Sequence, residues 1–127
     1  AEHSIRRSRE QLGVVQYTEE ERASLPPVPQ RVVRTHPGSH RETLYLAAHA
    51  SHILGMPVAD GRLIILDLIE HATQPRFVQA HRWLQGDLVV WDNRCTMHRA
   101  QPFDTTRVRD LRRATTQDVA STLEQAA

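Results

Sequence analysis

The stretch that decides the fold runs from Gly86 to Ala100 and reads Gly-Asp-Leu-Val-Val-Trp-Asp-Asn-Arg-Cys-Thr-Met-His-Arg-Ala. Its first part, residues 87–91, is rich in β-branched and aromatic side chains, which predicts a short strand. Asp92 and Arg94 are expected to form a local ion pair that orders the turn after this strand. The stretch therefore predicts a strand and an ordered turn that leads to His98.

Further strand patterns lie on both sides of this stretch. Residues 77–83 read as a strand that a Gly-containing turn separates from the first one, and residues 109–116 read as a last strand. Upstream, turn residues at 36–40 separate two extended segments, which predicts a hairpin. Its arms are expected at 31–34 and 43–46.

Two helices are expected in addition. Thr18 precedes three glutamates, which is typical of a capped helix N-terminus, and this short helix should stop at the proline-rich segment 25–29. Residues 58–72 carry apolar residues at helical spacing and predict one buried helix. The tail, 117–127, is expected to be a terminal helix or frayed.

Length and composition exclude several classes of function. The chain has 127 residues, enough for one hydrophobic core and too few for two. The net charge is +1, and every basic residue is Arg, so that no global field attracts nucleic acid or an anionic membrane. No apolar run approaches the roughly 20 residues of a membrane helix. We expect neither partner, and the lone Cys95 fits a cytoplasmic location.

Short strands around one helix favour a mainly β fold with helical decoration, a barrel or a sandwich, over a parallel α/β sheet. The chain also has eight His residues, which raises the question of a metal site. His49 and His52 are three residues apart, but the segment reads as a strand running into a loop. His40-Arg41-Glu42 has the His-x-carboxylate pattern of a metal ligand pair, yet it falls on the expected hairpin turn and reads more simply as a solvated loop.

The Gly86–Ala100 stretch resembles the C-terminal signature of the taurine/2,4-dichlorophenoxyacetate dioxygenase family, whose members depend on Fe(II) and 2-oxoglutarate. The resemblance covers almost the whole chain and is strongest to the phenoxyalkanoate-degrading branch. Four other stretches carry it: Arg34–Pro37, Ala48–His52, Glu70–Gln74 and His81–Trp83. The family's fold is a jelly roll, a double-stranded β-helix, and the resemblance makes residues 1–127 the C-terminal portion of one such domain.

The resemblance also implies roles for single residues. His98 matches the distal iron ligand, and Arg109 matches the arginine that binds the distal carboxylate of 2-oxoglutarate. Trp91 matches a residue near this cosubstrate, and Arg113 matches one that contacts the anionic end of the substrate. His49 matches a position around the substrate pocket, as His36 and His52 also do, although structural hydrogen bonding would explain these histidines equally well.

A physical argument supports the two arginines independently. On a strand, Arg109, Leu111, Arg113 and Thr115 would share one face, and in a barrel that face is the interior. An arginine inside a barrel is costly unless an anion pairs with it, and a dianionic cosubstrate supplies that anion. The alternative is a solvated edge strand whose arginines pair with Asp104 and Asp110.

The family's first two iron ligands, a His-x-Asp pair, would lie before the segment Glu2-His3-Ser4, and so would a Thr that assists Arg109. The chain shows no initiator Met and no apolar signal core. The resemblance therefore implies the C-terminal part of a protein about twice as long, because such domains run past about 200 residues. We expect the isolated chain to be inactive and its strands to lack some of their sheet partners.

The implied activity is hydroxylation of a small anionic substrate with O2 and 2-oxoglutarate, releasing succinate and CO2. The substrate is expected to be a phenoxyalkanoate such as 2,4-dichlorophenoxyacetate, whose ether bond is cleaved. A homo-oligomer of the full-length protein is compatible with this activity. The alternatives are a sulfonate or sulfate-ester dioxygenase of the same superfamily, and a non-catalytic β-domain that binds an anion.

Overall fold

Two small antiparallel sheets organise the N-terminal half of the chain in the computed structural model, which describes residues 1–13, 15–118 and 120–125. In the first sheet the strand order is β2-β1-β5, and in the second sheet β3 pairs with β4. The strands are β1 (Glu2–His3), β2 (Val28–Pro29), β3 (Val33–Thr35), β4 (Glu42–Leu44) and β5 (Ala50–His52). The β3–β4 pair, with Arg34 opposite Thr43, confirms the predicted hairpin.

Three α-helices and one short 3-10 helix complete the regular structure: α1 (Ile5–Gln11), α2 (Glu19–Ser24), α3 (Val58–Ala72) and η1 (Pro75–Phe77). α2 is the expected short helix. The Thr18 hydroxyl accepts from the backbone N–H of Glu21, whose carboxylate accepts from the Thr18 N–H, so that the capping box is complete. α1 was not predicted, although the Ser4 side chain caps its start and Arg6 pairs with Glu10 one turn later.

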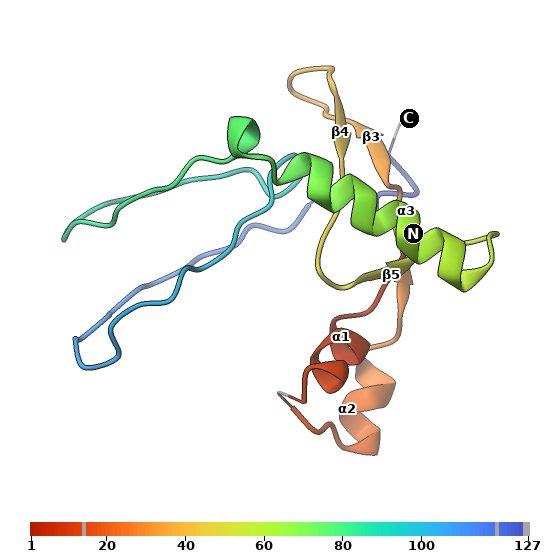
Figure 1. The fold of residues 1–127 in the computed structure, drawn as a ribbon, viewed down its shortest axis with the longest axis horizontal. Helices are drawn as coiled ribbons and strands as arrows, with labels where there is room; N and C mark the ends of the chain where they lie inside the picture. The colour runs from red at the N-terminus through yellow and green to blue at the C-terminus, as the bar shows by residue number, and fades with distance from the viewer. Residues whose placement is uncertain (14, 119, 126–127) are drawn as a thin grey trace.

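α3 spans the residues that the sequence predicts and packs against β5 (Figure 1). Gly61 faces the backbone of Ile53 so closely that a Cβ atom there would lie 2.6 Å from the Ile53 nitrogen. Only Gly61 and Ile65 are buried among the residues of α3, whereas Leu63 and Leu66 are exposed. The prediction of a buried helix is therefore wrong, because within the described chain one face of α3 alone finds a neighbour.

The structure contradicts the strands predicted at 77–83, 87–91 and 109–116. Residues 78–118 contain no strand. They form two arms that extend away from the helices and reverse at tight turns, 84–87 and 104–107, and between the arms the chain returns to the β3–β4 hairpin (Figure 1). An extended segment becomes a strand only when a neighbour completes its hydrogen-bond ladder, and here none does. The fold of the described residues is mixed α/β with short antiparallel sheets. The expected strands are present in the N-terminal half only, and the expected mainly β fold is therefore confirmed only in part.

The C-terminal tail folds back onto the sheets, and its described residues, 117–118 and 120–125, form no helix. The buried guanidinium of Arg34 forms an ion pair with Asp118 at 3.2 Å and also donates to Gln125. Thr122, which is buried too, bonds the Gln30 side chain and accepts from the Arg31 backbone. Residues 119 and 126–127 of the expected terminal helix or frayed end lie outside the described residues. None of the described helices combines the length and the apolar character needed to cross a membrane.

Candidate functional site

The turn after Trp91 is fixed by hydrogen bonds of one carboxylate. Both oxygens of Asp92 accept from Arg94, with 2.7 Å between Arg94 Nη2 and Asp92 Oδ2 and 2.9 Å between the Arg94 backbone N and Asp92 Oδ1. The Asp92 carbonyl oxygen accepts from the backbone N and the hydroxyl of Thr96. The expected local ion pair is confirmed, and it orders residues 92–96.

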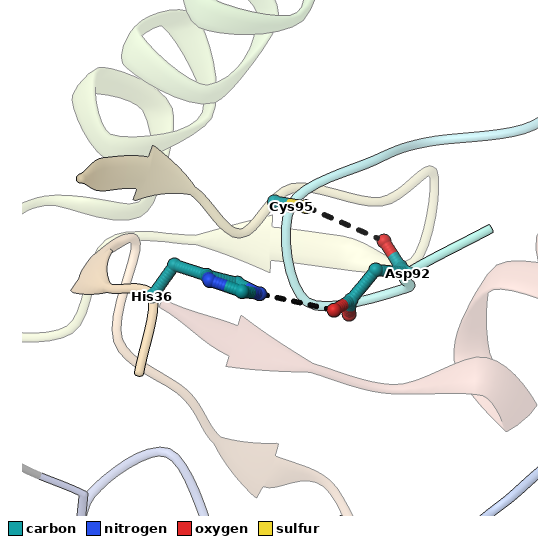
Figure 2. A group of neighbouring side chains, drawn as sticks. All are labelled: His36, Asp92 and Cys95. Carbon is teal, nitrogen blue, oxygen red and sulfur yellow. Dashed lines mark hydrogen bonds and ion pairs between the residues drawn. The ribbon is translucent and has the colours of Figure 1, made fainter. Parts of the chain in front are cut away.

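A second element holds the same carboxylate. His36 follows β3, and its Nε2 lies 3.0 Å from Asp92 Oδ2, across 56 positions of sequence (Figure 2). The other ring nitrogen, Nδ1, accepts from the backbone N–H groups of Gly38 and Ser39 at 3.2 and 3.1 Å. Because Nδ1 accepts, the proton of the neutral ring is on Nε2 and is donated to Asp92.

Charged and hydrogen-bonding neighbours determine the electrostatics of Asp92. The hydrogen bonds from Arg94, and after them the one from His36, hold the pKa of Asp92 well below its usual range. Asp92 is therefore an anion at every pH at which the protein would function. The hydrogen bond to Asp92 is also the largest cause of the raised pKa of Arg94.

Cys95 completes a group of three ligand types around this turn. One ligand atom each of His36, Asp92 and Cys95 lies within 4.8 Å of the others, which is close enough for a metal ion to bridge (Figure 2). The hydrogen bonds oppose this use. A metal on His36 Nε2 would move the ring proton to Nδ1, toward two backbone donors, and Arg94 already occupies both oxygens of Asp92. The group is better explained as a hydrogen-bonded network.

His98, the predicted iron ligand, lies just beyond this turn and is exposed. Its ring packs against Trp91, the predicted cosubstrate neighbour, with 4.9 Å between the ring centroids. Trp91 also donates its indole N–H to Asn93 at 2.8 Å. In the part of the chain that the structure describes, no hydrogen bond engages the His98 ring, so that both nitrogens are open to a ligand.

The two predicted anion-binding arginines come later in the chain and are exposed. The guanidinium of Arg109 stacks over Phe103 at 4.6 Å from the ring centroid. Among the residues that the structure describes, no carboxylate forms an ion pair with Arg109 or Arg113. The alternative pairing with Asp104 is not observed, since Asp104 bonds Thr106 and pairs with Arg107.

His49, the predicted substrate residue, lies before β5 in a cluster of rings. Its ring contacts His3 edge-on at 5.2 Å between centroids, and His3 stacks on Tyr45 at 5.6 Å. Burial, followed by repulsion from the positive charge of Arg9, lowers the pKa of His49. Burial also lowers the pKa of His3, to about 4. Both imidazoles are therefore uncharged near neutral pH.

The structure brings together some of the predicted site residues and not others. His98 and Trp91 are in contact, whereas within the described ranges no hydrogen bond, ion pair or ring contact joins His98 to Arg109, Arg113 or His49. Sequence reasoning missed the bond between His36 and Asp92, although both residues lie in stretches that carry the family resemblance. The position of His36 and Asp92 in those stretches is the one signal in the sequence that could have suggested a contact between the two side chains.

Comparisons with known proteins give a consistent result for the chain. The family described as "Taurine catabolism dioxygenase TauD, TfdA family" matches residues 1–115. The alpha-ketoglutarate-dependent 2,4-dichlorophenoxyacetate dioxygenase of Burkholderia sp. (strain RASC) is 54% identical over 116 residues, which cover 91% of this chain and 39% of that protein. The alpha-ketoglutarate-dependent sulfate ester dioxygenase of Pseudomonas putida is 37% identical over 84 residues, 66% of this chain and 28% of that one.

A solved structure is similar as well. It is that of AAD-2 in complex with Mn(II) and N-oxalylglycine, with a TM-score of 0.78 and 53% identity. The match covers 86% of this chain and 43% of that chain. The chain thus spans about two fifths of the length of these two relatives, the Burkholderia enzyme and AAD-2.

Proposed function

This chain belongs to the taurine catabolism dioxygenase TauD, TfdA family, and on that premise we propose that it is part of an Fe(II)- and 2-oxoglutarate-dependent dioxygenase. The proposed reaction hydroxylates a small anionic substrate. One oxygen atom of O2 enters succinate, formed with CO2 from 2-oxoglutarate, and the other enters a substrate C–H bond. The observation that carries the proposal is the identity of 54% to a 2,4-dichlorophenoxyacetate dioxygenase over 91% of the chain.

His98 is the proposed iron ligand of this chain. Its exposed ring, free of hydrogen bonds within the described chain, suits a neutral imidazole that donates a lone pair. When bound, the iron supplies the oxygen chemistry, while the protein supplies ligands and orientation. Trp91 packs on the His98 ring, next to the proposed iron ligand, and we propose that it lies beside the cosubstrate.

Arg109 is the proposed partner of the 2-oxoglutarate carboxylate. Its guanidinium is without a carboxylate partner among the described residues, and Phe103 supports one face of it. A planar guanidinium held in this way presents its N–H groups in the fork that binds a carboxylate through two parallel hydrogen bonds. Arg113 is proposed to bind the anionic end of the substrate in the same manner.

We assign a phenoxyalkanoate such as 2,4-dichlorophenoxyacetate as substrate. Hydroxylation of the carbon beside the ether oxygen gives a hemiacetal, which breaks down to a phenol and an aldehyde acid. The lowered pKa of His49 suits this substrate pocket, because an uncharged imidazole offers a hydrogen bond and an aromatic surface while Arg113 provides the charge. The higher identity to the phenoxyacetate enzyme favours it over a sulfate ester as the substrate.

The rest of the enzyme is part of the same proposal. A facial triad needs two ligands besides His98, and we propose that a His-x-Asp pair from a preceding portion of the domain provides them. That portion would also supply the missing partners of residues 78–118 and complete a jelly roll, with residues 1–127 as its C-terminal part. A cytoplasmic location, and a homo-oligomer of the whole protein, remain predictions.

The test is a kinetic comparison in the complete gene product that contains this chain, with Fe(II) and ascorbate present. Loss of a bidentate carboxylate pair costs about 2 to 5 kcal/mol, so Arg109→Ala should raise the KM for 2-oxoglutarate at least about 30-fold. The matched control is Arg112→Ala, which removes another exposed arginine of the same segment. In an extended segment Arg112 lies on the opposite face from Arg109, so this variant should leave the KM for 2-oxoglutarate unchanged. Equal effects of the two variants would refute the assignment of Arg109.

The same protein distinguishes the two alternatives. Substrate-dependent succinate release should be faster with 2,4-dichlorophenoxyacetate than with an alkyl sulfate or taurine, and the opposite ranking would favour a sulfur-ester or sulfonate substrate. A non-catalytic anion-binding domain would bind 2-oxoglutarate without converting it to succinate in the presence of any of these compounds.

A further inference from the structure

We propose that His36 is a positioning residue, which donates a hydrogen bond from Nε2 to Asp92 and thereby fixes the turn that carries Trp91 and His98. This inference rests on the proposed role of His98 as a metal ligand and deepens it. Nothing in the proposed chemistry requires His36 to touch substrate, metal or cosubstrate. Its action is indirect, through the backbone of the turn.

The geometry of His36 makes it a rigid connection between two parts of the chain. The side chain is 13% exposed, and both ring nitrogens are engaged, Nδ1 by its own hairpin and Nε2 by Asp92. A second, weaker contact between the same parts comes from the Thr43 hydroxyl, on β4, which shares its one proton between the Arg34 carbonyl oxygen of the hairpin at 3.2 Å and the Arg94 carbonyl oxygen of the turn at 3.4 Å. The β3–β4 hairpin therefore holds the turn at two points.

The turn transmits this position to the proposed site. The Asp92 carbonyl oxygen accepts from both the backbone N and the hydroxyl of Thr96, at 3.1 and 2.6 Å, so that a shift of Asp92 carries Thr96 with it. His98 follows two residues later, and Trp91 directly precedes Asp92. Residues 78–118 have no sheet to hold them in the described chain, which makes the two hairpin contacts important for orientation.

The two ring nitrogens can be tested separately, because two amide side chains each imitate one of them. In His36→Asn the amide oxygen can take the place of Nδ1 and accept from Gly38 and Ser39, but the side chain is too short to reach Asp92. In His36→Gln the amide NH2 can take the place of Nε2 and donate to Asp92, while the local acceptor is lost. If His36 only stabilises its own hairpin, the contact with Gly38 and Ser39 matters. If it positions the turn, the contact with Asp92 matters.

The experiment measures the dissociation constant of Mn(II), a redox-inert probe for the iron site, in the complete gene product by the electron paramagnetic resonance signal of free Mn(II). Removing a residue that orients the metal ligands without binding the metal typically weakens the affinity for the metal about 10- to 100-fold. We expect His36→Asn to weaken Mn(II) binding at least about tenfold and His36→Gln less than about threefold. The matched control is His40→Asn in the same turn, where φ is +55°, a conformation that Asn tolerates; it should leave the affinity unchanged.

Several results would overturn the proposal. An unchanged affinity in His36→Asn, or a loss in His36→Gln as large as that in His36→Asn, would assign His36 to the hairpin alone. If His98→Ala leaves Mn(II) binding intact, the proposed iron ligand itself is wrong and the positioning role falls with it, whereas loss in His98→Ala without loss in His36→Asn refutes only the latter. Should His36→Asn fail to fold, the ring 15N shifts of the unmodified protein decide: the proton must be on Nε2, and a proton on Nδ1 contradicts the proposal.

Discussion

Gly61 offers a sharp test of how α3 packs on β5. In Gly61→Ala the new Cβ atom would lie 2.6 Å from the Ile53 nitrogen, 3.1 Å from its oxygen and 3.3 Å from its Cα. Carbon atoms in good contact are about 3.5–4.0 Å from their neighbours. All three clashing atoms are backbone atoms, so no side-chain rotation relieves the overlap. The helix must move away from the strand, and the packing of Ile65 is disturbed as well.

Two opposing effects set the size of this change. Alanine is favoured over glycine inside a helix by about 1 kcal/mol, while overpacking a well-packed site costs about 1 to 3 kcal/mol and occasionally more. A clash of the new Cβ atom with backbone atoms falls at the upper end of that range, so the net loss in the free energy of unfolding should be about 1 to 2 kcal/mol.

Urea denaturation of the complete gene product measures this loss. The control is Arg62→Ala, which truncates the exposed neighbour and should change the free energy of unfolding by less than about 0.5 kcal/mol. A gain of about 1 kcal/mol in Gly61→Ala, the helix propensity alone, would mean that α3 does not approach Ile53 as described.

Three further predictions concern stability. His3 has its pKa lowered to about 4, chiefly by burial, from an ordinary 6.5; the unfolded chain therefore binds the proton first, and stability should be complete above pH 6.5 and fall by up to about 3 kcal/mol as the pH drops to 4. Denaturation at several pH values should show this dependence become smaller in His3→Phe, with a remainder from His49, whose pKa is also lowered by burial. Asp118→Ala leaves the buried Arg34 without its carboxylate and should cost about 3 kcal/mol, more than Arg34→Met does; equal losses in urea titrations would argue against it. Thr18→Ala removes the capping box and should cost about 1 kcal/mol, seen as lower helicity by circular dichroism.

Features that depend on nearby residues could be predicted from the sequence. Thr18 and Glu21 are three residues apart, and their capping box was expected from that spacing. The limits of α3 follow from its apolar periodicity and flanking residues, and the Asp92–Arg94 pair from its place in the turn. In each case the partners lie within one turn of the chain, so that the sequence contains the whole interaction.

Features that need distant partners could not be predicted in this way. The segment 109–116 has the composition of a strand, but a strand exists only with a neighbour, and Val108 beside it is 99% exposed. β1 has two residues and pairs with strands that start 26 and 48 positions after it, a distance that no local pattern encodes. The bond between His36 and Asp92 is of the same kind.

The roles of the site residues have a different origin. Nothing in spacing or composition distinguishes His98 from the other seven histidines of the chain. The alternation that separates Arg109 and Arg113 from Arg112 assumes a strand over residues 109–116, which the structure does not contain. Their assignment comes from the family resemblance, which the match over residues 1–115 supports at the level of the family. The contact between Trp91 and His98 agrees with that assignment without testing it.

One measurement decides whether this chain carries one iron ligand and the cosubstrate arginine of a larger catalytic domain. It is the rate of succinate release from 2-oxoglutarate, with Fe(II), O2 and 2,4-dichlorophenoxyacetate, by the complete gene product and by the 127-residue chain alone. We predict turnover by the complete gene product that His98→Ala abolishes, and none by the isolated chain. Succinate release by the isolated chain at the rate of the complete gene product, or an active His98→Ala variant, would contradict it.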